Sequence, residues 1–329
     1  MGYKLAGFEV IGCNEIDPRM MEAYKENHHP RLSYLEDIRI FKNRTDLPEE
    51  LYHLDILDGS PPCSSFSTAG NREEDWGKKK KFKEGQQAQI LDTLFFDFID
   101  LAKRLQSKVV VAENVKGLLM GSAREYYKKI CFAFEDAGYE IQSFLLNAAD
   151  MGVPQKRERV FFVGLRRDLC APFMQPVNLF HHKPILDLKF KERRVPFREI
   201  EEVGATSTQV ISDNTRELWS DTRPGDDFVK AWQKKHSTEK RGFFSYFRMH
   251  HDNVLNTIVA HKDNGDFHYS ECRGLSRLEL CRGGSFPEDY DFCGNPEKTI
   301  IGMSVPPLMI AKIATRIWEQ WLSKFKGEV

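Results

Sequence analysis

A cysteine that directly follows two prolines is the residue of this sequence with the clearest potential for chemistry. A short apolar run, Ile56-Leu57, lies between Asp55 and Asp58. The chain then continues with Gly59-Ser60-Pro61-Pro62, and Cys63 comes next. The prolines fix two φ angles and remove two backbone donors, so the pattern predicts a buried strand that ends in a stiff loop carrying the thiol. A thiol held in this way suits nucleophilic catalysis, while a cysteine buried beside a turn is the structural alternative.

A carboxylate lies at the end of a second predicted strand. Val109-Val110-Val111-Ala112 is typical of a buried parallel strand, and Glu113-Asn114-Val115 follows it. Ligands of doubly wound α/β folds bind at the carboxyl ends of the strands, so Cys63 and Glu113 are both expected at that edge of the sheet. Glu113 is then a candidate acid, although by itself it would be an ordinary carboxylate at a helix start.

Two arginines precede a further apolar run. Arg157 and Arg159 alternate within Gln155-Lys156-Arg157-Glu158-Arg159, just ahead of the predicted strand Val160–Leu165. Two guanidinium groups in this register can brace a phosphate and a pyrimidine carbonyl together, because arginine presents a fixed fork of donors. An ion pair with Glu158 or with another neighbour is the alternative.

Two more candidate carboxylates lie near the start of the chain. Residues 1–8 are expected to end a helix at Gly7, and 8–13 to form a strand that runs into Glu15. A carboxylate at such a strand end can accept hydrogen bonds from ribose hydroxyls, and Asp37 is placed to accept from the amine of a base. For Glu15, the alternative is a carboxylate at the start of a helix, a role that Asp17 could equally fill. For Asp37, the alternative is a solvated acid in a loop.

The remaining periodicity predicts helices over 90–105 and 123–137 and a strand over 139–146. Between Cys63 and the first of these helices, Gly70–Gln87 is polar and contains the run Lys78 to Lys81. This segment predicts a mobile loop whose lysines either face solvent or close over a phosphate backbone.

Composition narrows the class of protein. The 329 residues carry 48 basic and 49 acidic side chains, so bulk charge neither demands nor excludes a nucleic-acid partner. Seven cysteines without a CxxC pair, and no secretory segment, favour a reducing cytoplasm. No apolar run approaches the ~20 residues that span a bilayer, and no histidine spacing matches a zinc site, so neither a membrane nor a metal is expected.

Together these motifs resemble those of the cytosine-5 DNA methyltransferases, in the same order and over nearly the whole chain. The matching segments are Pro62-Cys63 with Phe66-Ser67, Glu113-Asn114-Val115, Gln155–Arg159, Arg273-Gly274-Leu275-Ser276 with Glu279, Phe286–Tyr290, and Gly302–Pro307. The resemblance implies an α/β fold: a Rossmann-like, class I methyltransferase, doubly wound sheet with its N-terminal strand missing, plus a smaller β-rich target-recognition domain. The expected domains are a catalytic domain over 1–175 with 297–329 packed back on it, a recognition domain over 176–272, and a supporting hinge over 273–296.

The resemblance also implies a reaction, in which a methyl group passes from S-adenosylmethionine to C5 of a flipped cytosine in a specific sequence of double-stranded DNA. A bacterial restriction-modification or phage-type enzyme of the cytosol or nucleoid is expected. The implied catalytic residues are Cys63, Glu113, Arg157 and Arg159. The implied cofactor-binding residues are Glu15, Ile16, Asp37, Ile38, Pro62, Leu94 and Ser304. The implied DNA-binding residues are Ser65, Ser67, Gln155, Lys79 and Lys80.

One departure from the family pattern concerns the cofactor. The family's opening strand and Phe-x-Gly-x-Gly loop have no counterpart ahead of Tyr3. Three interpretations stay open: the start is truncated or misassigned, a second chain supplies the strand, or the protein no longer methylates. The alternative to an active enzyme is a catalytically silent or split-subunit DNA-binding relative. Cofactor affinity is therefore the weakest link in the enzymatic interpretation, and we expect weak or absent methylation activity.

Overall fold

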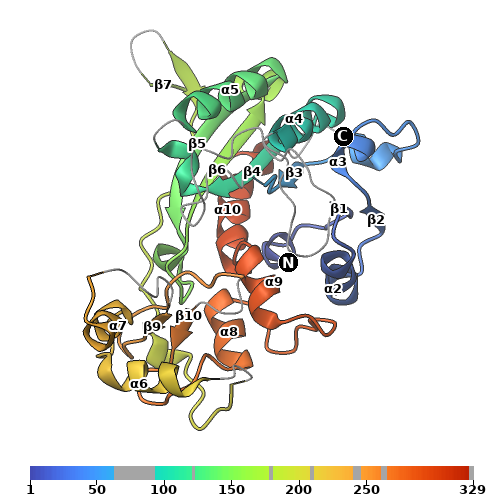
Figure 1. The fold of residues 1–329 in the computed structure, drawn as a ribbon. Helices are drawn as coiled ribbons and strands as arrows, with labels where there is room; N and C mark the ends of the chain where they lie inside the picture. Colours follow the sequence, from blue (N-terminus) through green and yellow to red (C-terminus); the bar gives the residue numbers. More distant parts are fainter. Residues whose placement is uncertain are drawn as a thin grey trace.

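A four-stranded sheet forms the centre of the molecule (Figure 1). The computed structural model describes residues 1–62, 93–120, 123–177, 181–207, 211–239, 246–260 and 265–325. The strand order is β3-β4-β6-β5, with bounds Ile56–Gly59, Val109–Val115, Glu158–Arg166 and Tyr139–Asn147 respectively. β3 and β4 are parallel, and β6 is antiparallel to both of its neighbours. Val109 to Ala112 are fully buried, as expected for a strand covered on both faces.

Two further strands form a separate sheet. β1 (Gly12–Glu15) and β2 (Leu32–Leu35) are parallel, and α2 (Pro18–His28) connects them. The Asp17 carboxylate caps α2 by accepting from the Arg19 backbone N–H at 2.9 Å, and Pro18 occupies the first turn, where its missing N–H costs nothing. Among the described residues, no strand joins this pair to the four-stranded sheet.

Helices cover both faces of the central sheet, which confirms the doubly wound prediction. On one face, α4 (Leu94–Leu105) and α5 (Ala123–Asp136) bury Phe95, Ile130 and Phe134 against the sheet. On the other face, α10 (Pro307–Gln320) packs its Met309, Ile313 and Ile317 side chains against β4 and β6. The short helices α1 (Gly2–Leu5) and α3 (Ile38–Phe41) lie beside α10 and α4.

The segment Glu297–Gln320 has the length and apolar composition of a membrane span, but 56% of it is buried within the fold. It comprises α9 (Glu297–Met303) and α10, which are separate helices. The apolar character of α10 is explained by its packing in the core of the sheet.

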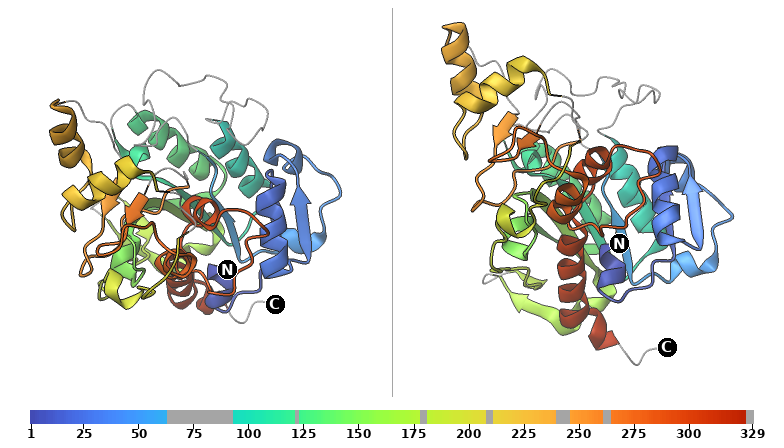
Figure 2. Two further views of the ribbon diagram at one scale, coloured as in Figure 1. Left: turned by 60° about the horizontal axis from the view of Figure 1, so that its bottom comes forward. Right: turned by 90° about the horizontal axis from the view of Figure 1, so that it is seen from below.

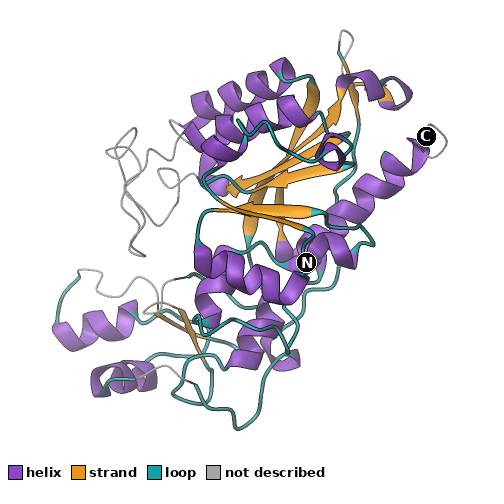
Figure 3. Ribbon diagram, turned by 90° about the vertical axis from the view of Figure 1, so that its right-hand side faces the viewer, coloured by secondary structure: helices purple, strands orange, loops and turns teal. Residues whose placement is uncertain are grey.

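The segment expected to be a β-rich recognition domain contains more helix than strand in its described residues. Its helices, α6 (Asp213–Asp221) and α7 (Val229–His236), lie at one end of the molecule, apart from the central sheet (Figures 2 and 3). Its strands have three residues each and are β8 (His182–Pro184), which pairs with β7 (Met174–Pro176), and β9 (Tyr246–Arg248), which pairs with β10 (Gly265–Phe267). The prediction of a β-rich lobe is therefore wrong for the described residues. Apolar aromatic side chains such as Phe228 and Phe267 pack the helices of this lobe against its small sheet.

A second core joins this lobe to the helix α8 (Arg277–Gly284) and to α9. It contains Met249, Leu255, Leu280 and Phe286. The Ser276 and Glu279 side chains form a reciprocal cap at the start of α8. The sequence-based domain boundaries stay predictions.

Candidate active site

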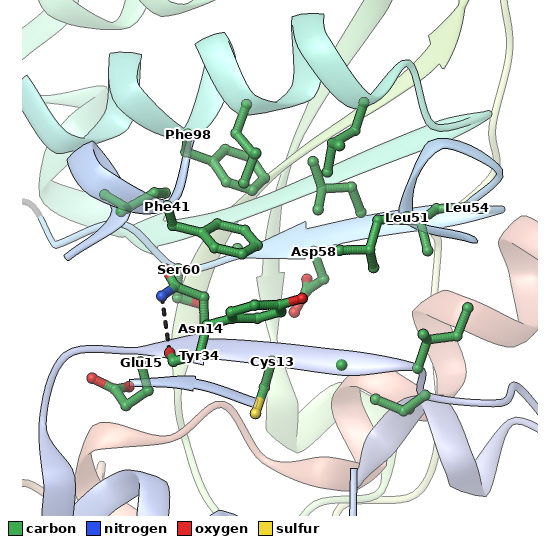
Figure 4. Close-up of a pocket in the computed structure, with 18 of the residues that line it drawn as sticks. Cys13, Asn14, Glu15, Tyr34, Phe41, Leu51, Leu54, Asp58, Ser60 and Phe98 are labelled. Atoms are coloured by element: carbon green, nitrogen blue, oxygen red, sulfur yellow. Dashed lines mark hydrogen bonds between the residues drawn. The ribbon is translucent and has the colours of Figure 1, made fainter. Parts of the chain in front are cut away.

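A cavity of about 620 Å³ lies between the β1–β2 pair and the central sheet, next to the carboxyl ends of β1 and β3 (Figure 4). Six of the seven residues predicted to bind a cofactor line it: Glu15, Ile16, Asp37, Ile38, Pro62 and Leu94. The seventh, Ser304, is not among the described residues that line this cavity. Its hydroxyl donates to the Ile300 carbonyl at 2.7 Å at the end of α9, and its role in cofactor binding stays a prediction.

Glu15 is held rigidly at the end of β1. Its Oε1 atom accepts from the backbone N–H groups of Ile16 and Asp17 at 2.7 and 2.9 Å. Burial raises the pKa of the Glu15 carboxyl, and the two backbone donors oppose this rise. Its Oε2 atom makes no hydrogen bond to another described side chain or backbone group, so this oxygen can accept a hydrogen bond from a ligand in the cavity.

Asp37 caps a short helix, a structural role that differs from the solvated loop acid given as its alternative. Its Oδ1 atom caps α3 by accepting from the Arg39 backbone N–H at 2.8 Å, and its carboxylate also pairs with the Arg39 guanidinium. The hydrogen bonds from Arg39 hold the pKa of Asp37 below its usual value, so this carboxylate is ionised at neutral pH. It faces the cavity as a fixed negative charge.

Glu113 and Arg159 form an ion pair at the end of the central sheet. The Arg159 Nε atom lies 2.8 Å from Glu113 Oε1, and both side chains are largely buried. Burial raises the pKa of the Glu113 carboxyl, while the charges of Arg159 and Arg157 and a hydrogen bond from Ser60 pull it down. Ser60 also lines the cavity, so the acid lies beside the cavity wall.

The residue after Glu113 fixes the loop that leads to the predicted nucleophile. The Asn114 side chain is 4% exposed, and its Nδ2 atom donates to the Pro61 carbonyl at 3.1 Å. Its Oδ1 atom accepts from the Val115 backbone N–H at 2.8 Å, which fixes the orientation of the amide. The end of β4 and the Pro61-Pro62 loop are therefore tied together.

Gln155 and Arg157 lie inside the protein and connect its two parts. Gln155 is 1% exposed, its Nε2 atom donates to the Gly283 carbonyl, and its Oε1 atom accepts from the Ile258 N–H. Arg157 donates from its Nη atoms to the carbonyls of Ile258 and Gly302 at 3.1 and 2.9 Å. Both polar atoms of the Gln155 amide are thus bonded in the interior, and its contact with DNA stays a prediction.

The Arg157 guanidinium has no carboxylate in direct contact among the described residues. Burial lowers its pKa to about 9, with the charge of Arg159 acting in the same direction. Its Nε atom is buried without a hydrogen-bond partner. Arg157 therefore acts as a positioning residue between β6, α9 and the segment around Ile258, whereas Arg159 faces Glu113.

A hydrogen-bonded pair that the sequence reasoning missed lies in the cavity wall. Tyr3 donates its hydroxyl to Asp58 Oδ1 at 2.9 Å. The Asp58 carboxylate reaches the open space of the cavity, yet the surrounding protein desolvates it and raises its pKa to about 6. The signal was present in the sequence, since Asp58 is the last charged residue of the strand before Gly59-Ser60-Pro61-Pro62.

One group of described side chains has the spacing of metal ligands. His250, His251 and Asp252 bring three candidate ligand atoms within 4.8 Å of one another. The Asp252 carboxylate already pairs with the Arg198 guanidinium, and His250 Nδ1 accepts from the Asp252 backbone N–H at 3.2 Å. This pairing competes with a cation, and the expectation of no metal stays a prediction.

The sequence matches the family model described as C-5 cytosine-specific DNA methylase over residues 1–319. The chain belongs to this family. It is 41% identical to the type II methyltransferase M.FnuDI of Fusobacterium nucleatum over 99% of the chain and 92% of that protein. It is 30% identical to the type II methyltransferase M.NgoFVII of Neisseria gonorrhoeae over 96% of the chain and 82% of that protein.

Solved structures agree on the fold. A putative DNA modification methyltransferase encoded within a prophage of E. coli superposes with a TM-score of 0.64 at 20% identity, covering 97% of this chain and 94% of that one. The DNMT2 protein of Spodoptera frugiperda superposes with a TM-score of 0.61 at 16% identity, covering 96% and 95%. The predicted Rossmann-like methyltransferase fold is thereby confirmed, and the chain is an enzyme of the DNA (cytosine-5) methyltransferase class.

Several residues to which the family resemblance gives roles lie outside the described residues. These are Cys63, Ser65, Ser67, Lys79 and Lys80. Their roles stay predictions, and the described chain on this side reaches Pro62, whose neighbour Pro61 is bonded to Asn114.

Proposed function

We propose that this enzyme transfers a methyl group from S-adenosylmethionine to C5 of a cytosine flipped out of a specific sequence of double-stranded DNA. Its type II methyltransferase relatives support a restriction-modification role in the bacterial cytosol. The observation that carries the proposal is the Glu113–Arg159 pair beside a ligand-sized cavity, at strand ends where α/β enzymes bind ligands.

Cys63 and Glu113 act together to activate the cytosine base. The Cys63 thiolate adds to C6 of the cytosine, and the displaced electron pair moves through C5 and C4 to N3, which takes the proton of Glu113. Burial favours the protonated form of Glu113 that this step needs. C5 thereby gains the nucleophilic character that the resting base lacks.

The same two residues also take part in the later steps of the catalytic cycle. When bound, S-adenosylmethionine would supply a methyl group on a positively charged sulfur and would leave as S-adenosylhomocysteine. Glu113 would take back the N3 proton as C5 accepts the methyl group. The C5 proton then passes to a base, the S–C6 bond breaks, and Cys63 leaves as the thiolate. Arg159 holds the Glu113 carboxyl at 2.8 Å and adds a positive charge near the thiolate's expected position.

The cavity fits a nucleoside cofactor. Its volume lies within the usual range for small-molecule sites, and Leu94, Ile38 and Phe98 provide apolar walls. Glu15 offers its Oε2 atom to ribose hydroxyls, and Asp37 offers negative charge near a base amine. Ile16 and Pro62 complete this end of the cavity.

The DNA contacts remain proposals from sequence. Cytosine must leave the helix stack to reach Cys63 and Glu113, at a cost of about a few kcal/mol. Ser65, Ser67, Lys79 and Lys80 are proposed to contact the phosphate backbone around the flipped base. Gln155 is instead proposed to support the lobe that reads the sequence, since its amide is bonded within the interior.

A mechanism-based trap tests the proposal. Bisulfite sequencing of DNA from cells that express the protein first identifies the methylated sequence. A duplex with 5-fluorocytosine at that position should then form a covalent adduct only when S-adenosylmethionine is present, because fluorine leaves no C5 proton to remove. Cys63→Ser and Glu113→Gln should abolish the adduct, and Cys293→Ser, at a half-buried thiol far along the chain, should not. Methylation that survives Cys63→Ser would refute the proposal.

A second candidate is a catalytically silent or split-subunit DNA-binding relative. The observation that supports this candidate is that, among the described strands, β1 and β2 make no hydrogen-bonded pair with the central sheet. Calorimetry discriminates the two: tight binding of S-adenosylmethionine by this chain alone would exclude the split-subunit form.

A further inference from the structure

We propose that Lys42 is a positioning residue for the nucleoside end of the cavity. It links α3 to α4, and both helices contribute side chains to the cavity wall. We call the contacts of Lys42 with Asp97, Asp100 and Arg104 the α3–α4 clamp. These contacts are features of the fold, and only the identity of the ligand that they serve rests on the proposed function.

Three side chains of α4 contact this one residue at the end of α3. The Lys42 Nζ atom lies 2.7 Å from Asp97 Oδ1 and donates to Asp100 Oδ2 at 2.6 Å. The Arg104 Nη1 atom donates to the Lys42 carbonyl at 2.7 Å. The ammonium and the backbone carbonyl of Lys42 are therefore both bonded to the same helix.

Each α4 residue of the clamp directly precedes a residue that lines the cavity. The pairs are Asp97 and Phe98, Asp100 and Leu101, and Arg104 and Leu105. Successive residues of an α-helix are about 100° apart around its axis, so the two sets form neighbouring stripes on the surface of α4. A rotation of α4 that broke the clamp would also turn the lining side chains away from their places in the wall.

The helix on the other side of the clamp depends on outside contacts. α3 has four residues, and isolated helices shorter than about 12 residues are marginal in water. Its Ile38 and Phe41 side chains line the cavity. Figure 4 shows Phe41 of α3 and Phe98 of α4 on the same side of the cavity, with Glu15 on the other side. The clamp thus joins two helices that together form one wall.

Arg104 is itself held in place by a further contact. Its Nη2 atom donates to the Tyr52 hydroxyl at 2.8 Å, and its guanidinium carbon lies 5.8 Å from the centre of the Tyr52 ring. Tyr52 ends the short helix η1 (Glu49–Tyr52), whose Leu51 also lines the cavity. Arg104 therefore connects a third part of the wall to the Lys42 carbonyl.

The ion pair of the clamp is shielded from water. The side chains of Lys42 and Asp97 are 18% and 13% exposed. Burial lowers the pKa of the Lys42 ammonium, but the hydrogen bonds to Asp100 and Asp97 outweigh burial and raise this pKa. Lys42 is therefore charged at neutral pH, and its pairing is screened by salt less than that of an exposed pair.

The expected consequence of breaking the clamp concerns binding and not the chemical step. Among the described contacts, no clamp residue bonds to Glu113 or Arg159. The clamp is the same before and during methyl transfer, so its loss should raise KM for S-adenosylmethionine and leave kcat unchanged. A role confined to stability would lower the thermal unfolding midpoint without moving KM.

Steady-state methylation kinetics with the full-length protein test the proposal. Lys42→Met keeps most of the side-chain length and removes the ammonium. We expect KM for S-adenosylmethionine to rise by about 10-fold at unchanged kcat, the change that corresponds to one hydrogen bond to a charged group. Lys42→Arg keeps the positive charge and should restore most of the lost affinity. An unchanged KM in Lys42→Met would overturn the proposal.

Two further variants complete the comparison. Lys312→Met removes a similarly buried ammonium, which is paired with Glu192 and is not among the described residues that line the cavity, so it should leave KM unchanged. Asp97→Ala breaks the clamp from the other side, and it provides the test if Lys42→Met does not fold. The variant with both clamp substitutions should raise KM no further than Lys42→Met does, because contacting residues are not additive. Additive effects would overturn the clamp.

A probe that contains only the nucleoside separates the clamp from the proposed function. Adenosine binding, measured by calorimetry, needs neither DNA nor methyl transfer, and Lys42→Met should weaken it by about 10-fold as well. Adenosine binding that depends on Lys42 in a protein that does not methylate DNA supports the clamp and overturns the proposed function. Equal binding by the wild type and Lys42→Met overturns the clamp, and absence of binding by the wild type overturns both proposals.

Discussion

The side chain of Asn114 offers a sharp test of how the active site is held together. We expect Asn114→Asp to slow methyl transfer. The new carboxylate keeps the acceptor for Val115 N–H but replaces the Nδ2 donor by an oxygen that faces the Pro61 carbonyl. A buried carbonyl left without its donor costs about 1–3 kcal/mol. If the transition state requires the native loop geometry, this free energy is added to the activation barrier, and the rate drops by roughly 5- to 150-fold.

The assay is single-turnover methylation of duplex DNA, with thermal unfolding measured in parallel. Protonation of the introduced carboxyl restores a donor toward Pro61, so the rate of the variant relative to the wild type should rise as the pH is lowered. Asn114→Ala cannot recover in this way, and its relative rate should not change with pH.

Asn43→Asp is the matched control. The Asn43 Nδ2 atom donates to the Arg39 carbonyl at 2.8 Å, so the same atom replacement breaks the same kind of bond at an exposed position. This control should retain wild-type rate. An Asn114→Asp variant within about twofold of the wild type would refute the idea that this amide positions the loop, since twofold is below the smallest cost expected.

Three further predictions concern the parts that support the site. Arg157→Lys should speed amide exchange in the segment around Ile258 by about 10-fold, because one ammonium cannot replace a fork that serves two carbonyls. Glu279→Gln should lower the free energy of unfolding in urea by about 1–3 kcal/mol, because the buried Arg273 guanidinium loses its Glu279 partner while it keeps the Glu271 carboxylate. Burial raises the pKa of Asp266 to about 6 from 3.8, so stability should fall as pH rises from 4 toward 6, and Asp266→Asn should remove this slope in pH-dependent urea titrations.

The pH dependence of Glu279 has the opposite sign. Burial raises its pKa, but the hydrogen bonds from Arg273 and from two backbone N–H groups outweigh burial and hold the pKa below its usual value. The stability that this carboxylate contributes is therefore present at neutral pH and is lost as the pH falls through its folded pKa. A Glu279→Gln variant should not show this loss in acid unfolding followed by circular dichroism.

Local sequence patterns predicted the elements well where burial is continuous. The apolar run from Val109 to Ala112 indicated a strand covered on both faces, and the predicted helix over 123–137 corresponds to α5. The strand expected over 8–13 begins later, at Gly12, where the register of residues paired with β2 begins with Leu32. Such patterns indicate the periodicity of apolar residues along a strand, but they do not indicate which strand it pairs with.

Local sequence patterns did not predict which partners the long polar side chains contact. Arg157 and Arg159 alternate in sequence, yet Arg159 reaches Glu113 because β6 pairs antiparallel with β4, which places Arg159 diagonally from Glu113. Arg157 instead meets the carbonyl of Ile258, which lies about a hundred positions further along the chain. Ser304 matched a cofactor position in sequence and lies in a helix cap in the structure.

The sequence by itself determined the family, the order of the motifs and the strands and helices that carry them, because these follow from residue types at fixed short spacings. Only the tertiary structure decided which carboxylates are engaged, which amide ties the loop before Cys63 to β4, and that β1 and β3 line a common cavity. The physical reason is that burial and hydrogen-bond pairing depend on residues that are distant in the chain. β1 and β3 are 40 or more positions apart, and no local pattern encodes the space between them.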